Sequence, residues 1–387
     1  DHRDLHSFPT RRSSDLSKII ETADIADVIG EYVKLSRRGR NFIGLCPFHN
    51  EKTPSFIVSP DKSIYKCFGC HKAGNVVSFL MEYNSVPFHD AIKDLAERYS
   101  VQLPKYSQES DKSYDNREMM YNALSEAAAY YHKLLYSKTG AETLKYFKSR
   151  DFNDATIKKF QLGFAPDAFT ELIDYLKKKN YSEDILLSAG LAYKNEKNRV
   201  FDRFRNRAVF PIKDFIGRVV GFGARLMSDD KSQAKYINSP QSEIYDKSSI
   251  LYGLFEAKNS IRQKGYTILT EGYADVITLS QNETENVVAS SGTALTYGQL
   301  KLLKKFSDKI FFCYDGDSAG QKATDAGAEL ALANGFEVLI IRLPEDEDPD
   351  SLVRKNGASL DYYIQNAQDY IEYKLDKAKS EGITNSI

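Results

Sequence analysis

The stretch Lys309-Ile-Phe-Phe-Cys-Tyr-Asp-Gly-Asp317 is an apolar run that ends in two acidic residues separated by a glycine. The same pattern occurs earlier, where Tyr266-Thr-Ile-Leu-Thr270 is followed by Glu271-Gly-Tyr-Ala-Asp275. Short β-branched and aromatic runs with almost no charge predict strands that are buried on both faces of a largely parallel sheet. Residues with helical spacing follow each acidic group. In such sheets ligands bind beyond the carboxyl ends of the strands.

A third acidic group, residues 345–350, follows the strand-like run 336–341. Residues 268–350 contain 15 Asp and Glu against 6 Lys and Arg, although the net charge of the whole chain is −1. Two carboxylates roughly 4 Å apart repel each other by about 4 kcal/mol at an effective dielectric constant near 20. Oxygen ligands of this kind suit Mg²⁺ or Mn²⁺. The pattern indicates a metal-dependent phosphoryl-transfer site, and solvated helix caps and turns are the alternative.

Two pairs of metal-ligand residues occur near the amino terminus, in Cys46-Pro-Phe-His49 and Cys67-Phe-Gly-Cys70. Sulfur and imidazole donors in two such pairs are typical of a tetrahedral structural zinc site. Segments 55–58 and 63–66 are expected to form strands of a zinc ribbon. Unpaired buried cysteines would not explain two pairs in register. Four Cys in 387 residues also argue against disulfides, and Cys313 is expected to be a small core residue.

Basic and aromatic residues alternate around these ligand pairs. Cations that contact phosphates and rings that stack on bases are the usual means of holding a single nucleic-acid strand. At least half of the rings are instead expected to form the small core of the ribbon. The rings concerned are Phe42, Phe48, Phe56, Tyr65 and Phe68.

Residues 194–247 form a basic segment with 12 Lys and Arg against 7 Asp and Glu. Alternation of apolar and polar residues in 204–214 and 217–225 predicts a β-hairpin, in which Gly221 and Gly223 allow a ligand or another part of the chain to approach closely. Such a segment can neutralise phosphates, and a solvated charged face is the alternative.

Together these motifs resemble the bacterial replicative primases of the DnaG type, which have a zinc-binding domain and an RNA polymerase domain that contains a Toprim fold. His71 departs from the family pattern, which usually has glycine there, and is expected to be exposed beside the ligand Cys70. The likeness covers roughly residues 17–370. It is carried by the two ligand pairs, Phe204-Arg-Asn-Arg207, Gly221-Phe-Gly-Ala-Arg225, Lys235-Tyr-Ile-Asn-Ser-Pro240, Glu271-Gly-Tyr-Ala-Asp275 and Asp315-Gly-Asp317.

The resemblance implies roles for individual residues. Glu271, Asp315 and Asp317 would be catalytic, with Glu271 acting as metal ligand or general acid/base. Two or more Mg²⁺ or Mn²⁺ would be held by Glu271, Asp315, Asp317, Asp348 and Asp350. Asp275 would position these ligands without contacting the metals itself. Template or nucleotide phosphates would be bound by Arg205, Asn206, Arg207, Arg225, Lys235 and Lys247. One structural Zn²⁺ would be held by Cys46, His49, Cys67 and Cys70.

The implied activity is that of a DNA primase, a nucleotidyltransferase that makes short RNA primers on single-stranded DNA from ribonucleoside triphosphates. The implied zinc domain reads the template where synthesis starts. The resemblance also implies a monomer in the bacterial cytoplasm that joins the replisome by binding the replicative helicase through a carboxyl-terminal domain beyond this chain. The alternatives are a primase of a phage or mobile element and a non-catalytic zinc and Toprim recombination scaffold.

The expected fold is multidomain and combines α+β and α/β parts. No apolar run approaches the length of a membrane span. The expected segments are a non-native leader (1–16), the zinc-ribbon DNA-binding domain (17–103), a polar linker (104–117), a basic subdomain of the polymerase domain (118–260), the mostly parallel Toprim subdomain (261–345), and the acidic metal loop with the start of a truncated helical part (346–387).

Overall fold

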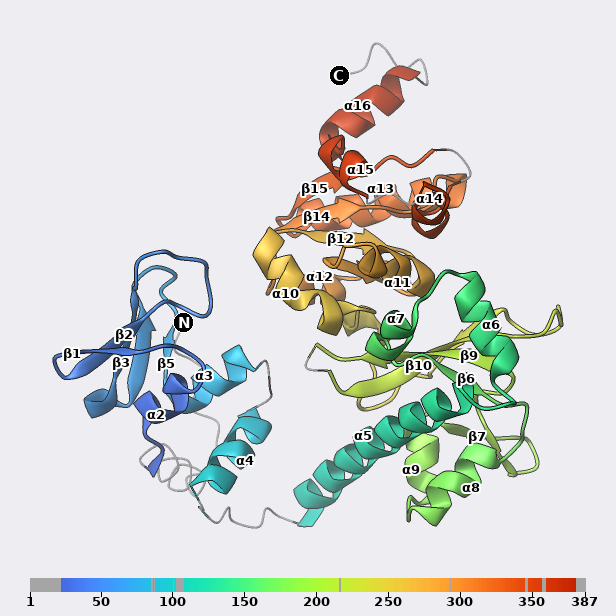
Figure 1. Cartoon of the computed structure of the whole chain (residues 1–387), viewed down its shortest axis with the longest axis horizontal. Coiled ribbons are helices and arrows are strands. Elements are labelled where there is room, and N and C mark those ends of the chain that lie inside the picture. Colours follow the sequence, from blue (N-terminus) through green and yellow to red (C-terminus); the bar gives the residue numbers. More distant parts are fainter. Residues whose placement is uncertain are drawn as a thin grey trace. The chain divides into compact units, whose positions relative to one another are not determined.

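The chain divides into two compact units, with the boundary between Asp111 and Lys112, in a computed structural model. The structure describes residues 22–84, 86, 88–99, 101, 108–215, 217–292, 294–344, 347–356 and 360–380. The expected leader, 1–16, lies outside the described residues. The boundary falls inside the segment expected to be a linker. Figure 1 labels the elements of both units.

The first unit is built around a five-stranded antiparallel sheet with the order β1-β2-β3-β4-β5. Helices α2 and α3 pack against this sheet, and α4 packs against α3. The predicted ribbon strands are confirmed. The elements are α2 (Ile25–Gly30), β1 (Ser36–Arg38), β2 (Asn41–Gly44), β3 (Phe56–Ser59), η1 (Pro60–Lys62), β4 (Ile64–Cys67), β5 (Ala73–Gly74), α3 (Val76–Tyr83) and α4 (Phe88–Arg98).

Aromatic rings occupy the centre of this small core. Phe56, Tyr65 and Phe79 are fully buried, and the Phe48 ring lies against all three. Phe42 and Phe48 are partly buried, whereas Phe68 is 58% exposed. The expectation that at least half of the ribbon's rings serve its core is therefore confirmed.

The second unit contains two larger sheets and a hairpin among its described residues. One sheet is antiparallel with the order β11-β10-β9-β6. In the other, β13-β12-β14-β15-β16, the first four strands are parallel and β16 is antiparallel to β15. The predicted hairpin and the mostly parallel sheet are both confirmed. The strands are β6 (Gly163–Ala165), β7 (Ala192–Lys194), β8 (Val200–Asp202), β9 (Arg207–Lys213), β10 (Val219–Leu226), β11 (Tyr236–Asn238), β12 (Thr267–Thr270), β13 (Val287–Ala289), β14 (Lys309–Phe312), β15 (Glu337–Ile340) and β16 (Gln368–Asp369).

Helix α5 of the second unit begins at Gln108, within the segment expected to be a linker. The stretch 108–117 is polar but contains no Gly or Pro, so nothing in it interrupts a helix. The helices are α5 (Gln108–Leu135), α6 (Ala141–Ser149), α7 (Asp154–Lys159), α8 (Glu171–Lys178), α9 (Glu183–Ser188), η2 (Lys247–Ser249), α10 (Leu254–Lys264), α11 (Tyr273–Gln281), α12 (Tyr297–Leu303), α13 (Ser318–Ala333), α14 (Pro349–Asn356), α15 (Asp361–Gln365) and α16 (Tyr370–Ser380).

One buried tyrosine joins the two larger sheets of the second unit. The Tyr273 ring, at the start of α11, stacks on Phe210 of β9 with ring centroids 5.2 Å apart and meets the Tyr252 ring edge-on at 4.7 Å. Its hydroxyl donates to Asn238 Oδ1 at 2.8 Å. A Cβ atom at Gly223 of β10 would overlap the Tyr273 ring. The predicted close approach at Gly223 is thus made by this ring.

Replacing Gly223 with alanine should destabilise the second unit. The added methyl group would push against a buried ring, and such overpacking costs about 1–3 kcal/mol. Urea unfolding monitored by circular dichroism would measure the change. Gly30→Ala is the control, because a Cβ atom there meets nothing within 4 Å and the backbone needs no positive φ. Equal stability of the two variants would contradict the expectation.

Candidate metal centres

The four predicted zinc ligands meet in one cluster of the first unit. Cys46 follows β2 and Cys67 ends β4, and the ligand atoms of Cys46, His49, Cys67 and Cys70 all lie within 4.8 Å of one another. Cys46 Sγ is 3.8 Å from Cys70 Sγ, and Cys67 Sγ is 3.8 Å from His49 Nδ1. Ligand atoms bound tetrahedrally at about 2.3 Å would be roughly 3.8 Å apart, so both spacing and donor type suit zinc.

The surroundings of the cluster favour a bound cation. Burial raises the pKa of the Cys46 thiol to about 12, so a nearby positive charge is needed for this sulfur to ionise at neutral pH. The N–H groups of Gly69 and Cys70 donate to Cys67 Sγ at 3.3 and 3.4 Å. His49 Nε2 lies 3.3 Å from Glu51 Oε2, which orients the ring so that Nδ1 faces the sulfurs.

Gly69 and His71 flank the ligand Cys70 in the second ligand pair. A Cβ atom at Gly69 would lie 2.6 Å from His49 Nε2, so the backbone can pass the imidazole only without a side chain. His71 has a φ of 62°, is exposed and does not belong to the cluster, as expected.

The predicted acidic residues follow parallel strands of the second unit at one edge of the sheet. Glu271 comes directly after β12, Asp315 and Asp317 follow β14, and Asp348 lies beyond β15 at the start of α14. Because β12, β14 and β15 run parallel, their carboxyl ends share an edge (Figure 1). The Asp315 N–H donates to Glu271 Oε1 at 3.3 Å, which joins the first two groups directly.

Burial and the negative charge of neighbouring carboxylates raise the pKa values of three acidic residues at this edge. Burial, followed by the charges of Glu271, Asp348 and Asp317, raises the pKa of Asp315 to about 7. Burial and then Asp317 raise the pKa of Glu271. Burial, Asp315 and Asp348 raise that of Asp275. Buried oxygen donors with such unfavourable charge fit a hard divalent cation.

The acidic residues are more widely spread than the zinc ligands. Within the described part of the chain, the Cys and His cluster is the one set of three or more such groups whose ligand atoms meet within 4.8 Å. Asp317 also caps α13 by accepting from the Gly320 N–H at 2.7 Å, and Asp348 accepts from the Ser351 N–H at 2.6 Å. These two carboxylates therefore serve as helix caps, as the alternative interpretation expected, and caps leave further lone pairs for a hydrated Mg²⁺.

Asp350 has a different environment from that expected of a metal ligand. Its side chain is 2% exposed and forms an ion pair with Arg150, with Arg354 Nη1 at 3.5 Å from the same oxygen. Its other oxygen accepts from Thr278 Oγ1 of α11. Arg354 also pairs with Asp151 at 2.9 Å, so this network ties α14 to α11 and to the α6–α7 turn. A metal role for Asp350 stays a prediction, and the contacts present are those of a clamp.

Asp275 follows Glu271 by four residues, and its supporting role behind the metal ligands stays a prediction. It is in the first turn of α11, is 8% exposed, and accepts from the Gly272 N–H at 2.9 Å. This bond shapes the turn that presents Glu271.

The predicted phosphate-binding residues do not share one environment. Arg207 is buried, with Nη1 3.1 Å from the Ala234 carbonyl oxygen, and Asn206 adopts a φ of 48° at a bend. Lys235 is exposed, and the Arg225 guanidinium lies 4.4 Å from the centre of the Tyr146 ring. Arg205 stacks on Phe169 at 4.1 Å. Arg207 thus has a contact within the fold, and phosphate binding by Arg207 and Asn206 stays a prediction.

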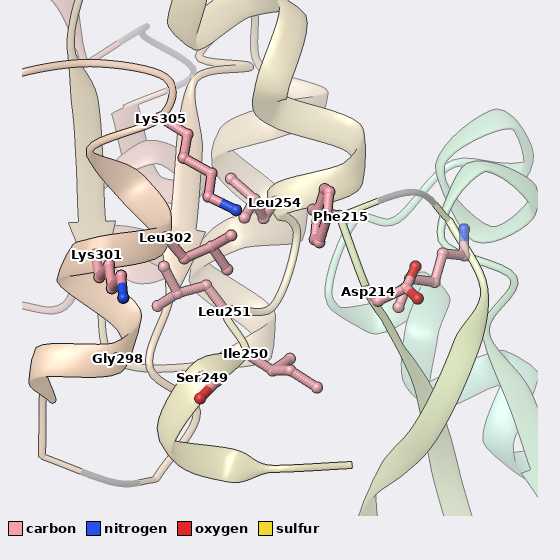
Figure 2. A pocket seen from close by; sticks show the side chains of 11 residues that line it. Asp214, Phe215, Ser249, Ile250, Leu251, Leu254, Gly298, Lys301, Leu302 and Lys305 are labelled. Atoms are coloured by element: carbon pink, nitrogen blue, oxygen red, sulfur yellow. The ribbon is translucent and has the colours of Figure 1, made fainter. Parts of the chain in front are cut away.

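Lys247 lines a small cavity whose lining includes none of the predicted metal ligands. The cavity also touches Asn238, Ser290 and Ser291, and the Ser291 N–H donates to the Glu271 carbonyl oxygen at 3.1 Å. A larger cleft of about 340 Å³ lies next to it, and Ile250 lines both. Figure 2 shows Lys301 of α12 and Lys305, which follows α12, on one side of this cleft, and Phe215 on the other side. This cleft contains none of the predicted metal ligands.

Sequence reasoning missed Arg150 and Asn238. Arg150 follows a helix with no distinctive motif, and its partner Asp350 is 200 residues away. Asn238 lies within the quoted Lys235–Pro240 block, but its bonds to Tyr273 and to the Ser291 carbonyl oxygen depend on the packing of two sheets.

Comparison with known proteins places these centres in a family. The family described as CHC2 zinc finger matches residues 11–111, DNA primase catalytic core, N-terminal domain, matches 130–258, and Toprim-like matches 268–353. The crystal structure of the Aquifex aeolicus primase (zinc-binding and RNA polymerase domains) is 38% identical, covers 95% of this chain and 88% of that chain, and gives a TM-score of 0.64. The chain belongs to the DnaG-type bacterial primase family.

Other members of the primase family are similarly close. The DNA primase of Clostridium acetobutylicum is 44% identical over 369 residues, which cover 94% of this chain and 60% of that protein. A DnaG primase catalytic domain bound to single-stranded DNA is 32% identical, covers 69% of this chain and 84% of that chain, and gives a TM-score of 0.63. The chain thus spans about three fifths of its first curated primase relative. None of its described helices has the length and apolar character of a membrane span.

Cys67→Ala should remove zinc from the chain, because three donors of a structural site hold the ion much less tightly than four. Zinc content per purified chain, measured by mass spectrometry of the element, should fall from about one to near zero at equilibrium with a weak chelator. Cys313→Ala changes a buried thiol outside the cluster and should keep its zinc. Retention of zinc by Cys67→Ala would refute the ligand set.

Arg150→Ala should destabilise the second unit by about 3 kcal/mol. The change removes one of the two cations that balance the negative charge of the buried Asp350 carboxylate. Denaturant unfolding provides the measurement. Lys148→Ala, two residues before Arg150 in the sequence, removes an exposed ion pair with Asp154 and should change stability by less than about 1 kcal/mol. If both variants lower the free energy of unfolding by a similar small amount, the Arg150–Asp350 ion pair does not stabilise the second unit.

Proposed function

We propose that this chain forms the zinc-binding and polymerase parts of a DNA primase that synthesises short RNA primers on single-stranded DNA from ribonucleoside triphosphates. The observation that carries this proposal is the set of mutually repelling carboxylates at the carboxyl edge of a parallel sheet, with Glu271 and Asp315 in contact. Family membership supports a nucleotidyl-transfer reaction for this set.

In this proposal Glu271, Asp315, Asp317 and Asp348 hold two or more Mg²⁺ or Mn²⁺. When bound, the cations would supply Lewis-acid stabilisation of the negative charge that develops as a primer 3′-hydroxyl attacks a nucleotide α-phosphate and pyrophosphate leaves. Burial, followed by the charge of Asp317, raises the pKa of Glu271 and so makes this carboxylate a better proton acceptor than an exposed glutamate. Asp350, through its clamp on α11 and α14, would fix the elements that carry Asp275 and Asp348.

Nucleotide and template phosphates would meet the cationic groups nearest this edge. Lys247 lines the cavity beside Ser291, and Arg225 lies over Tyr146, whose neighbour Arg150 contacts Asp350. Lys235 is exposed on the same antiparallel sheet's margin. The related DnaG primase catalytic domain is bound to single-stranded DNA in its own structure, which supports DNA as the template here.

The zinc ribbon would recognise the template at the start of synthesis, and its exposed Phe68 beside Lys66 offers a ring and a cation for one base step. We further propose a monomer that works in the bacterial cytoplasm at the replisome with the replicative helicase as partner.

Asp315→Asn should reduce primer synthesis by about a hundredfold or more, because it removes a charged ligand for the cations while leaving the shape of the side chain intact. Ribonucleotide incorporation on unprimed single-stranded DNA with Mg²⁺ measures it, and DNA binding should persist. Asp308→Asn lies at the opposite end of the same strand, is 80% exposed, and is expected to keep full activity. Unchanged synthesis by Asp315→Asn would exclude this residue from the reaction.

A further inference from the structure

The cleft of about 340 Å³ lies between the turn that joins β9 to β10 and the helix α12. Its surface is mostly apolar, and two lysines line it on the α12 side (Figure 2). A volume of this size falls within the range of ligand-binding sites, about 300–1,000 Å³. We name it the lysine cleft and define it by Phe215, Leu251, Leu254, Lys301, Leu302 and Lys305.

Hydrogen bonds hold the turn that carries Phe215. The Asp214 carboxylate accepts from the N–H groups of Gly217 and Arg218, each at 2.9 Å. Lys258 Nζ donates to the Phe215 carbonyl oxygen at 2.9 Å. The fold therefore sets the position of this wall before any partner binds, which lowers the entropic cost of binding there.

The remaining apolar lining consists of aliphatic side chains. Leu251 and Leu254 are almost fully buried members of the core around the parallel sheet, and the partly buried Leu302 packs against the same core. Phe215 supplies a ring, and Lys305 already lies over that ring at 5.3 Å. Nucleic-acid bases usually stack on exposed aromatic rings, whereas this lining suits an aliphatic side chain.

The charged groups of the lysine cleft leave a positive surplus. Two charged residues that also line it are already paired within the fold, in the Lys213–Glu256 and Asp214–Arg218 ion pairs of 2.7 and 2.9 Å. Lys301 and Lys305 are exposed and have no carboxylate partner within the part of the chain that the structure describes. The complementary ligand therefore carries negative charge beside an apolar group.

We propose that the lysine cleft binds an acidic segment of a partner protein. An aliphatic side chain of the segment would occupy the cleft, and its carboxylates would pair with Lys301 and Lys305. The cleft shares Ile250 with the cavity that Lys247 lines, and its lining includes none of the predicted metal ligands. This interaction surface therefore goes beyond the proposed function and can be tested separately from primer synthesis.

The test measures binding of a fluorescein-labelled peptide, Asp-Asp-Leu-Leu-Asp-Asp, to the full chain by fluorescence anisotropy. We expect saturable binding with a dissociation constant below about 1 mM. The peptide Asp-Asp-Ser-Ser-Asp-Asp lacks the aliphatic side chains, and Lys-Lys-Leu-Leu-Lys-Lys reverses the charge. Each should bind at least about tenfold more weakly. No saturable binding of the acidic leucine peptide, or equal binding of either control peptide, would overturn the proposal.

Charge reversal provides the matched variants of the chain. Lys301→Glu combined with Lys305→Glu should weaken binding of the acidic leucine peptide about tenfold, because two attractive charge pairs become repulsive. The control combines Lys178→Glu with Lys231→Glu, which changes the net charge equally at exposed positions outside the cleft. It should leave the affinity within about twofold, because distant exposed charges are screened by salt. Equal weakening by both double variants would refute the cleft as the binding site.

Other occupants of the cleft would give different results. The single strand oligo(dT) should not displace the peptide, and displacement would assign the cleft to nucleic acid instead. Sedimentation of the chain alone should be the same for the wild type and for Lys301→Glu combined with Lys305→Glu. A dimer that only the wild type forms would assign the cleft to a second copy of the chain. Either result would overturn the proposal.

The outcome is independent of the proposed chemistry. Asp315→Asn should bind the acidic leucine peptide as tightly as the wild type, whether or not the variant synthesises primers. If Asp315→Asn keeps its activity, the catalytic proposal fails while peptide binding still decides on the lysine cleft. If the peptide does not bind and Asp315→Asn is inactive, only the inference about the lysine cleft is wrong.

Discussion

Mutual repulsion among partly buried carboxylates is the constraint on which the second unit depends. The parallel strands β12, β14 and β15 bring Glu271, Asp315 and Asp348 to one edge, where burial and like charge raise the pKa of Asp315 to about 7. A sheet that carries such unfavourable charge needs rigid support from its neighbours. Helix caps at Asp317 and Asp348 and the Arg150 clamp on Asp350 provide this support.

The two units obtain their stability in different ways. The first unit has a small core centred on Phe56, Tyr65 and Phe79, and its cysteines and histidine form a cluster that suits a structural cation. A domain of this size gains much of its folding free energy from metal binding. The second unit relies on larger clusters of buried side chains, with Tyr273 joining its two main sheets. Loss of zinc is therefore expected to affect the first unit far more than the second.

Local sequence patterns predicted the strands, the hairpin, the parallel sheet and the zinc cluster, because each depends on residues close together in the chain. Glu271 and Asp315 were predictable for the same reason, since strand ends are visible in the pattern of apolar residues. The Arg150–Asp350 ion pair could not be predicted, because the two residues are 200 positions apart and no sequence motif relates them. The resemblance assigned Arg207 to phosphates, and the fold buries most of its side chain against backbone carbonyl groups. Those contacts depend on how β9, β10 and the segment before β11 pack, which the local sequence does not reveal, and the phosphate role of Arg207 stays a prediction.

The donor atoms of the two metal centres have a chemical consequence for a cell that contains several metals. The cluster in the first unit offers soft sulfur with one imidazole, whereas the sheet edge offers hard carboxylate oxygen alone. The sulfur cluster would reject Mg²⁺, but carboxylate oxygens bind Zn²⁺ at least as tightly as Mg²⁺ or Mn²⁺. Selection of Mg²⁺ or Mn²⁺ at the sheet edge would therefore depend on the free concentrations of the ions in the cell, whereas selection of zinc by the cluster would depend on its donor atoms.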